Sequence, residues 1–303
     1  MTKDFAIVYY MTEWRADLAL QLSASLTSLD LLGIGAQRVH RYLTLTEPVS
    51  EATKSFLDSR GVEVLIRDRF TQAQPFANKT LISVSQPHRV VMCCDLDIVF
   101  LGNPLPLFER AASSRRFLAR PDFGNPLYWW PEFPAPIARF LQKKVGRAIW
   151  QRMRSRYRKL QGNEAVPYFN SGIFLCPGPL FSELMCHWWR ACSSLLRARR
   201  RRYPYIFFFT FHFYDQLALS LALESSGIPF DVVGAEYNYM PTKDKQELCS
   251  SPIACHLVTD LRGWYDLTKE HSAPGNEDVY GRVREILREN NRFGAGSGHR
   301  YTD

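Results

Sequence analysis

Two aspartates that follow an apolar run are the residues of this chain best suited to chemistry. The run extends from Val90 to Cys94, and Asp95 and Asp97 come directly after it. A short, wholly apolar run predicts a strand that is buried on both faces, as in a parallel sheet. Side chains at i and i+2 of an extended chain point to the same side, so both carboxylates can meet one ion. Carboxylate oxygens suit a hard cation such as Mg²⁺ or Mn²⁺, which keeps open positions for phosphate oxygens.

A solvated turn after the strand is the alternative interpretation of these aspartates. Two carboxylates so close together repel each other unless a positive charge lies between them, and a bound divalent cation supplies that charge. Ligands of open α/β sheets bind beyond the carboxyl ends of the strands, where Asp95 and Asp97 are expected to lie. The sequence therefore favours a metal site here.

A second group of polar residues lies at the end of a predicted loop. Asn170, Ser171 and Gly172 precede the apolar residues 173–176, which predict another buried strand. A short amide, a hydroxyl and a glycine allow a polar ligand such as a sugar to approach closely. A plain turn before a strand is the alternative.

Three further side chains are candidates for a functional site. Asp215 and Gln216 begin a predicted helix, where simple capping is the alternative role for the carboxylate. His256 ends a short apolar run, and a structural role is the alternative for a single histidine at a strand end.

The elements that must position these residues alternate along the chain. Strands separated by helices predict a parallel sheet with crossover helices, a nucleotide-binding architecture. The sequence contains neither GxGxxG nor GxxxxGK[ST], so neither a dinucleotide fingerprint nor a P-loop is indicated. The predicted strands are 5–10, 37–45, 62–66, 90–94, 117–119, 173–176, 230–233 and 253–257, and the predicted helices are 15–32, 49–59, 78–86, 179–196, 213–223 and 279–290.

The fold class expected from this order is α/β: a single domain with a mostly parallel, Rossmann-like sheet flanked by helices. That domain is predicted to span residues 1–290, with a basic and aromatic insert at 122–165 and a flexible polar tail at 291–303. Within the insert, 122–136 is predicted to be a loop and 137–160 a basic amphipathic helix, either an ordinary surface helix or one that lies on anionic lipid.

Composition narrows the partners and the compartment. The 303 residues are 46% hydrophobic, which allows a sizeable core, and the net charge of +8 favours anionic partners. The start of the chain has no signal-peptide pattern and no apolar run is long enough to span a membrane. Seven cysteines at irregular spacing, without a CxxC pair, indicate reduced thiols, so a cytoplasmic location is expected.

An arginine run beside aromatic residues is the strongest surface signal. Residues 197–202 contain five arginines, and residues 203–211 are mostly Tyr and Phe. Basic residues attract lipid phosphates, and aromatic rings settle at the level of the headgroups. We therefore expect this part of the chain to meet the inner face of a membrane, with a core strand beside a solvated charge run as the alternative.

Taken together, these motifs resemble those of a GT-A-type glycosyltransferase. They are most similar to the retaining family of glycogenin and the bacterial lipopolysaccharide galactosyl- and glucosyltransferases. The end of the pattern departs from that family, because its usual Lys-Pro is missing before Trp264 and Arg262 stands nearby instead. The matching residues are Asn78, Lys79, the run from Val90 to Pro104 with its Asp-x-Asp, Asn170, Ser171, Gly172, Asp215, Gln216, Tyr237, Asn238, His256, Gly263 and Trp264.

The resemblance implies an activity and a role for each residue. The chain would transfer a sugar, with retention, from a nucleotide-sugar such as a UDP-sugar to a cell-surface glycan or glycolipid. Asp95, Asp97 and His256 would bind Mn²⁺ or Mg²⁺. The catalytic residues would be Gln216 near the anomeric carbon, Asp215 on the sugar hydroxyls (or as general base if the enzyme inverts) and Asn170. The donor would be held by Tyr10, Thr12, Lys79, Asp95, Ser171, Gly172, Asn238, Arg262 and Gly263.

Two other classes stay open from the sequence. A nucleotidyltransferase also places paired aspartates on a sheet, but it would usually carry a Gly-rich phosphate loop near the first strand, and this chain has none. A non-enzymatic binder of anionic polymers would fit the net charge but not the aspartate pair. Nucleic acid is not an expected partner, because the aromatic residues are too continuous for spaced stacking platforms.

Overall fold

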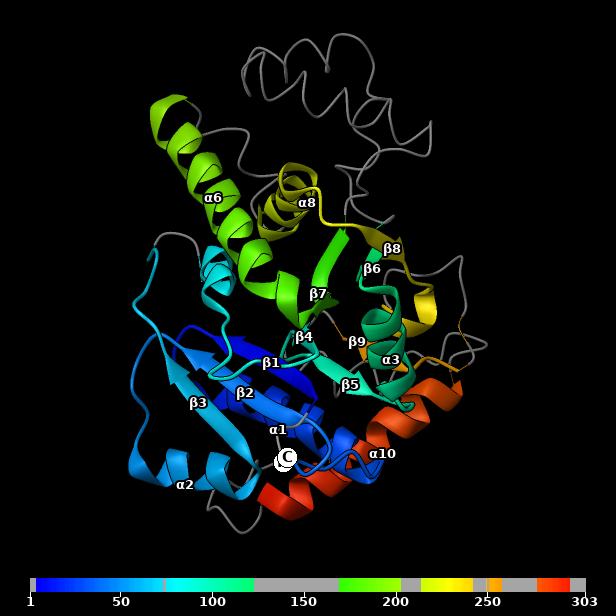
Figure 1. Cartoon of the computed structure of the whole chain (residues 1–303). Helices are drawn as coiled ribbons and strands as arrows, with labels where there is room; N and C mark the ends of the chain where they lie inside the picture. Colours follow the sequence, from blue (N-terminus) through cyan, green and yellow to red (C-terminus); the bar gives the residue numbers. More distant parts are fainter. Residues whose placement is uncertain are drawn as a thin grey trace, which may run out of the picture.

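A central sheet of seven strands, in the order β3-β2-β1-β4-β7-β6-β8, forms the middle layer of the protein (Figure 1). The structure is a computed structural model that describes residues 4–72, 75–122, 169–202, 214–241, 249, 251–257 and 277–294. The four strands at one side of the sheet are parallel, as predicted. They are β1 (Phe5–Met11), β2 (His40–Leu45), β3 (Val62–Ile66) and β4 (Val90–Cys94).

The other side of the sheet contains one reversed strand. β7 (Phe169–Pro177) pairs antiparallel with both β4 and β6 (Phe117–Pro121), and β8 (Phe230–Val232) runs parallel to β6. β6 therefore points in the same direction as β4. As a result, the carboxyl ends of β1, β4 and β6 and the start of β7 lie along one edge of the sheet. The α/β class and the mostly parallel sheet are confirmed.

Alternating strand residues form two separate cores, one on each face of the sheet. Ile7 and Tyr9 pack among residues from α1, α2 and α3, whereas Ala6 and Val8 pack among residues from η1, α6 and α8. This alternation is the period of an extended chain that is buried on both faces. The helices are α1 (Ala16–Leu31), α2 (Glu51–Ser59), α3 (Leu105–Ser114), α6 (Gly178–Arg202) and α8 (Tyr214–Ser226), and the 3-10 turn η1 covers Pro75–Leu81.

A small second sheet lies beside α1 and α10 (Glu277–Gly294). It consists of β5 (Ile98–Phe100) and β9 (Ala254–His256), which are antiparallel. Val99 and Cys255 of this sheet share a buried cluster with residues of α10 and with Ala24 of α1. The second sheet therefore packs against both α1 and the last helix. Helix α10 ends at Gly294, so it includes the first four residues of the predicted tail.

Two local predictions are wrong, and one helix was missed. Residues 78–86 are not a helix: only η1 forms, because the Asn78 side chain bonds the backbone of Thr71 and because Pro87 disfavours a helical Gln86. Helix α3 was not predicted. The triplet from Asn170 to Gly172 is not in a loop but inside β7, where the sheet on both sides supplies partners that the local sequence does not reveal.

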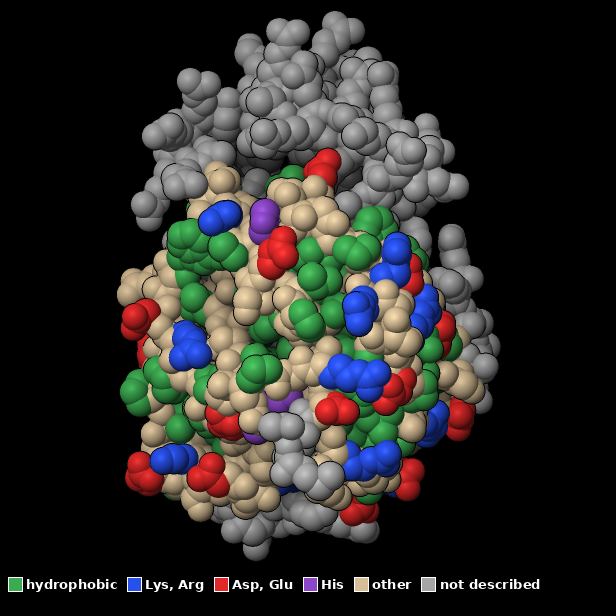
Figure 2. All heavy atoms as spheres, in the orientation of Figure 1, with side chains coloured by type: hydrophobic (Ala, Val, Ile, Leu, Met, Phe, Trp, Pro, Cys, Tyr) green, Lys and Arg blue, Asp and Glu red, His purple; other side chains and the backbone are tan. Residues whose placement is uncertain are grey.

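The surface predictions are only partly covered by the described residues. α6 continues through Arg202, so the arginine run is the last part of a helix, whereas residues 137–160 and 203–211 lie outside the described residues. None of the described helices combines the length and the hydrophobicity that a membrane span requires. On the face drawn in Figure 2, the described Lys and Arg side chains alternate with Asp and Glu. Ion pairs among the described residues include Arg116–Asp231 (2.6 Å) and Arg89–Glu109 (3.6 Å).

Candidate active site

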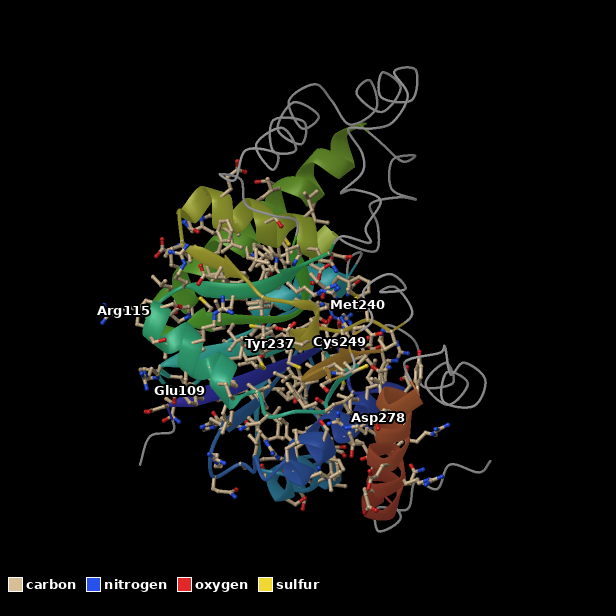
Figure 3. The ribbon with its side chains drawn as sticks, turned by 90° about the vertical axis from the view of Figure 1, so that its right-hand side faces the viewer. Glu109, Arg115, Tyr237, Met240, Cys249 and Asp278 are labelled. Carbon is tan, nitrogen blue, oxygen red and sulfur yellow. The ribbon has the colours of Figure 1, made fainter. Side chains whose placement is uncertain are left out.

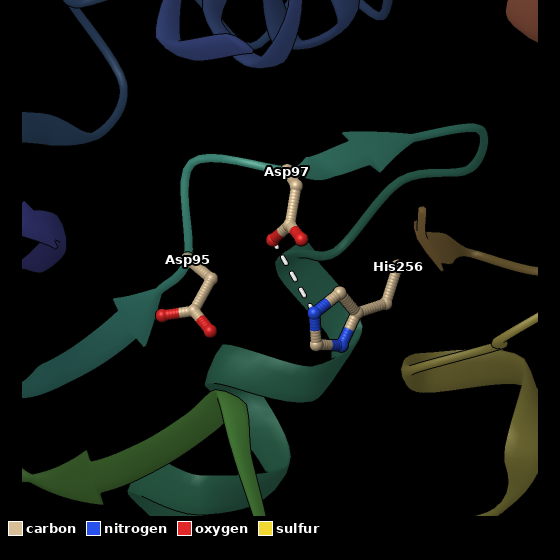
Figure 4. A group of neighbouring side chains, drawn as sticks. All are labelled: Asp95, Asp97 and His256. Atoms are coloured by element: carbon tan, nitrogen blue, oxygen red, sulfur yellow. Dashed lines mark ion pairs between the residues drawn. The ribbon is translucent and has the colours of Figure 1, made fainter. Parts of the chain in front are cut away.

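The two aspartates and His256 come together beyond the end of β4 (Figure 4). One potential ligand atom from each of Asp95, Asp97 and His256 lies within 4.8 Å of the others. Nε2 of His256 is 3.3 Å from Oδ1 of Asp97. The three side chains come from the end of β4, the start of β5 and the end of β9, so residues far apart in the sequence meet at one point of the fold.

Backbone pairing explains why these side chains converge. Ile98 pairs with His256 across the small sheet, and the amide of Leu257 donates to the carbonyl oxygen of Asp97 at 3.0 Å. The amide of Asp95 donates to the carbonyl oxygen of Gly172 on β7 at 2.7 Å. Each of the three is therefore held by backbone hydrogen bonds to a strand from elsewhere in the chain, which leaves little freedom at the site.

Lys79 brings a buried positive charge to the same place. Its Nζ lies 2.7 Å from Oδ1 of Asp95 and 3.2 Å from Oδ2 of Asp215, and it is 3.5 Å from Oγ of Ser171. Ser171 in turn donates a short hydrogen bond to Oδ2 of Asp215. The indole of Trp188 donates to the backbone oxygen of Asp215, which fixes the first turn of α8 against α6. Lys79 thus joins the aspartates at the end of β4 to the start of α8.

The pKa shifts in this cluster follow from burial and from charge. Burial raises the pKa of Asp95 to about 6, although Lys79 opposes the rise, and Asp97 adds to it. Burial would also raise the pKa of Asp97, but the charges of His256 and Lys79 outweigh burial and lower it. Burial would lower the pKa values of Lys79 and His256, but the carboxylates outweigh it and raise both. The pKa of Asp95 is therefore raised even though Lys79 lies beside it, because burial and Asp97 outweigh the charge of the lysine.

A chain of side-chain amides lies behind the histidine. Nδ1 of His256 is 3.1 Å from Oδ1 of Asn238, and Nδ2 of Asn238 donates to Oδ1 of Asn170 at 2.9 Å. The same oxygen of Asn170 accepts from the amide of Gly172 at 2.8 Å. Asn238 lies in the short segment between Tyr237 and Met240, which are both labelled in Figure 3. Asn170, Gly172, Asn238 and His256 therefore form one connected network.

Two buried side chains, one at the start of α8 and one after β6, have oxygen atoms without a partner in the part of the chain that the structure describes. Oε1 of Gln216 and both carboxylate oxygens of Asp122 have no hydrogen-bond partner within the described ranges. Asp122 is fully buried and directly follows β6, whose carboxyl end lies at the same edge as that of β4. A buried polar atom without a partner costs about 1–3 kcal/mol, so a ligand that supplies hydrogen-bond donors would recover that cost.

The sequence did not single out Asp122. It falls at the boundary between a predicted strand and a predicted loop, and nothing in its neighbours distinguishes it from a solvated aspartate. The one feature of the sequence that could have identified Asp122 as a candidate is its position directly after a strand, which it shares with Asp95. That feature becomes useful only when β6 is known to run parallel to β4, which depends on the reversed strand between them.

The remaining predicted site residues lie either at the end of β1 or outside the described residues. Tyr10 and Thr12 lie at the end of β1, at the same edge, and their hydroxyl oxygens are 3.0 Å apart. Burial raises the pKa of Tyr10 to about 12, so its hydroxyl stays protonated and can donate. Arg262 and Gly263 lie outside the described residues.

The chemistry of Asp95, Asp97 and His256 fits a divalent cation. Two carboxylates and one imidazole form a mixed oxygen and nitrogen ligand set, which suits Mn²⁺ and accepts Mg²⁺. The raised pKa of Asp95 indicates a carboxylate that a further positive charge would stabilise. Because Mn²⁺ and Mg²⁺ take more ligands than these three, positions would remain open for oxygen atoms of a phosphate.

The fold and this site define a glycosyltransferase of the GT-A type. The sequence matches the model of the Rhodobacterales glycosyltransferase domain over residues 18–227, which is more than half of the chain. The chain belongs to this family. No curated protein sequence matches it significantly. Membership of a glycosyltransferase family favours that class over the nucleotidyltransferase and the non-enzymatic binder considered above.

Solved structures support the fold at low sequence identity. LgtC, a galactosyltransferase described in complex with donor and acceptor sugar analogs, is 12% identical, with a TM-score of 0.53 over 97% of this chain and 100% of that one. GlyE, a glycosyltransferase of Streptococcus pneumoniae TIGR4, is 13% identical, with a TM-score of 0.53 over 98% of this chain and 64% of that one. WbbM, a bifunctional glycosyltransferase, is 13% identical, with a TM-score of 0.54 over 95% of this chain and 50% of that one. This chain thus spans only part of GlyE and of WbbM.

Proposed function

We propose that the protein is a metal-dependent glycosyltransferase that moves a sugar from a nucleotide-sugar, with UDP-sugars as the first choice, to a cell-surface glycan or glycolipid. The convergence of Asp95, Asp97 and His256 beside Lys79 is the observation that carries this proposal. It combines a cation site with a fixed positive charge at the edge where α/β sheets bind nucleotides. The description of LgtC with donor and acceptor sugar analogs supports the same type of reaction.

The charged residues would prepare the leaving group. Asp95, Asp97 and His256 would hold Mn²⁺ or Mg²⁺, which when bound neutralises charge on a departing diphosphate as a Lewis acid. Lys79 would add its own charge to the same region, and its contacts with Asp95 and Asp215 keep the ammonium in place without solvent. A buried, preorganised charge stabilises developing negative charge more strongly than one in water.

The polar residues near α8 would bind the transferred sugar. Asp215 is already oriented by Ser171 and Lys79, so its carboxylate can accept from a sugar hydroxyl without rearrangement. Oε1 of Gln216, which is buried without a partner among the described residues, suits a contact close to the reacting carbon. We assign Asp122 to a second sugar hydroxyl for the same reason, because its two carboxylate oxygens need donors.

Residues from the other strands would complete the donor site. Tyr10 and Thr12 would contact the nucleotide from the end of β1, and Ser171 and Gly172 would lie below the diphosphate and sugar. Asn170 would support the sugar side, and Arg262 and Gly263 would bind the diphosphate. We propose retention of the anomeric configuration; with inversion, Asp215 would serve as general base.

A panel of nucleotide-sugars tests this proposal directly. The protein is incubated with each sugar donor and Mn²⁺, and the released nucleoside diphosphate is measured with and without a chelator. We expect one class of donor to be hydrolysed only when the metal is present, and an NMR spectrum of the sugar product from an acceptor reaction then gives the anomeric outcome. Absence of metal-dependent hydrolysis across the whole panel, by protein whose fold is intact, would contradict the proposal.

A further inference from the structure

The amide network behind His256 determines which ring nitrogen carries the proton. A backbone N–H can only donate, so the atom of Asn170 that meets the amide of Gly172 at 2.8 Å is the carbonyl oxygen. That oxygen also faces the Asn238 amide at 2.9 Å, so the Asn238 atom there must be its NH₂ group. The other end of Asn238, 3.1 Å from Nδ1 of His256, is then an oxygen, which can only accept.

The consequence for the imidazole is a defined tautomer. Because the oxygen of Asn238 accepts, Nδ1 of His256 is the nitrogen that bears the hydrogen, and in the neutral ring the lone pair is on Nε2. Nε2 is the atom that lies 3.3 Å from Oδ1 of Asp97. The lone pair therefore points to the place where a cation would sit.

Without this network, Asp97 would favour the opposite tautomer. A carboxylate next to Nε2 attracts a hydrogen on that nitrogen, and an Nε2–H···Asp97 hydrogen bond would occupy two of the three ligands at once. Asn238 opposes this arrangement because its side-chain oxygen forms a hydrogen bond only when the hydrogen is on Nδ1. The Asn238 side chain is fully buried, and both ends of its amide form hydrogen bonds, one with His256 and one with Asn170.

Gly172 holds the ring in the same orientation by contact. A Cβ atom at this position would lie 2.3 Å from Cε1 and 2.7 Å from Nδ1 of His256, much closer than van der Waals contact allows. The imidazole therefore packs directly on the β7 backbone, and the glycine both supplies the N–H that starts the network and leaves room for the ring that ends it.

We propose that Asn238 is a positioning residue for the cation: through Asn170 and Gly172, it sets the His256 tautomer that leaves Nε2 free to bind metal. This inference rests on the proposed metal site and adds a determinant of its affinity. Partners that orient a ligating histidine typically change metal affinity by about 10- to 100-fold when they are removed. Asn238 would then act on the cation through His256.

A pair of variants with similar side-chain shape separates this role from simple packing. Asn238→Leu removes both the acceptor opposite Nδ1 and the donor to Asn170, whereas Asn238→Asp keeps the acceptor opposite Nδ1 and loses only the donor to Asn170. Free Mn²⁺ is followed by electron paramagnetic resonance during titration of the protein with Mn²⁺ alone, and circular dichroism melting checks the fold. We expect about 10- to 100-fold weaker Mn²⁺ binding for Asn238→Leu and recovery toward the wild type for Asn238→Asp. Equal weakening in both variants would overturn the proposal.

A double-mutant cycle with His256→Ala tests whether Asn238 acts through the histidine. In that background, Asn238→Leu should cause no further loss of Mn²⁺ affinity, because the ring it orients is gone. Fully additive losses would contradict the inference. If the wild type itself fails to bind Mn²⁺, or if Asp97→Asn does not weaken binding, the metal site and the proposed function fail instead, which is a separate outcome.

A measurement on the unaltered protein keeps the test independent of variant folding. With ¹⁵N-labelled histidine and saturating Mg²⁺, which is diamagnetic, nitrogen NMR distinguishes a protonated ring nitrogen from an unprotonated one. His256→Ala assigns the signals by their loss. We expect a hydrogen at Nδ1 and none at Nε2. A hydrogen at Nε2 in the wild type would refute the inference.

Discussion

The two halves of the candidate active site are built differently. In the half around Asp97 and His256, backbone pairing between β5 and β9 fixes both residues, and amides occupy the far side of the imidazole. In the other half, to which we assign Gln216 at the start of α8 and Asp122 after β6, buried oxygen atoms have no partner within the described residues. In the first half, the side chains already have hydrogen-bond partners and would gain only a cation. In the second half, the buried oxygens would gain hydrogen bonds from a ligand that carries donor groups.

This difference indicates what each half can recognise. A rigid cluster of two carboxylates and an imidazole suits a metal ion, because a cation requires fixed distances. Unpartnered oxygens suit a molecule with several hydroxyl groups, because each new hydrogen bond removes a cost of about 1–3 kcal/mol. Lys79 connects the halves through Asp95 and Asp215, so a change in one half is expected to reach the other.

The largest effect is expected from removing one charge in the metal half. Asp97→Asn should abolish Mn²⁺-dependent turnover, with a loss of about 100-fold or more, because Lewis-acid stabilisation is worth several kcal/mol. The melting temperature should stay close to that of the wild type, since the backbone bond from Leu257 to residue 97 is kept. Turnover is measured over a range of Mn²⁺ concentrations. Normal activity with unchanged metal dependence would remove Asp97 from the site.

The next effect separates the sugar half from the nucleotide. Asp215→Asn and Gln216→Ala should each lower kcat by about 10- to 100-fold, as expected from a lost hydrogen bond of about 1–3 kcal/mol. The affinity for UDP, measured by calorimetry, should change much less, because these residues are assigned to sugar and not to base. Parallel losses of UDP affinity and rate would place them in the wrong half.

The stability of an Asp122 variant tests whether the unpartnered oxygens serve a ligand or the fold. A neutral amide costs less to bury than a carboxylate without a partner, so Asp122→Asn should stabilise the ligand-free protein by about 1 kcal/mol. The same change should weaken binding of the sugar substrate by about tenfold, through a hydrogen bond lost to a sugar hydroxyl. Thermal melting and steady-state kinetics measure the two effects. A variant that is less stable and fully active would show that Asp122 serves the fold and not the ligand.

The smallest effect concerns the arginine run at the end of α6. Each Lys or Arg near an anionic membrane contributes about 1 kcal/mol before screening, so Arg199, Arg200, Arg201 and Arg202 could support attachment. In sedimentation with anionic vesicles, the protein should pellet at low salt, and replacing these four arginines by serine should reduce binding. Protein that stays in the supernatant would direct the search toward an acceptor away from a membrane.

Strand positions and the aspartate pair could be predicted because they depend on local patterns. Val90 to Cys94 is apolar on both faces, and the two aspartates follow at a spacing of two, so the sequence alone placed them at a strand end. Asn170 was placed in a loop, since its amide looks solvated until the partners at Gly172 and Asn238 are known. Asp122 was missed because its burial depends on pairing between distant strands.

The most direct test of the account is to locate the cation. Crystals of the protein grown with Mn²⁺, with and without UDP, give an anomalous signal that identifies the metal without assumptions about activity. The account predicts one strong peak within bonding distance of Asp95, Asp97 and Nε2 of His256, with Lys79 beside it. A peak elsewhere, or Asp97 and His256 paired with each other while Mn²⁺ saturates the crystal, would contradict it.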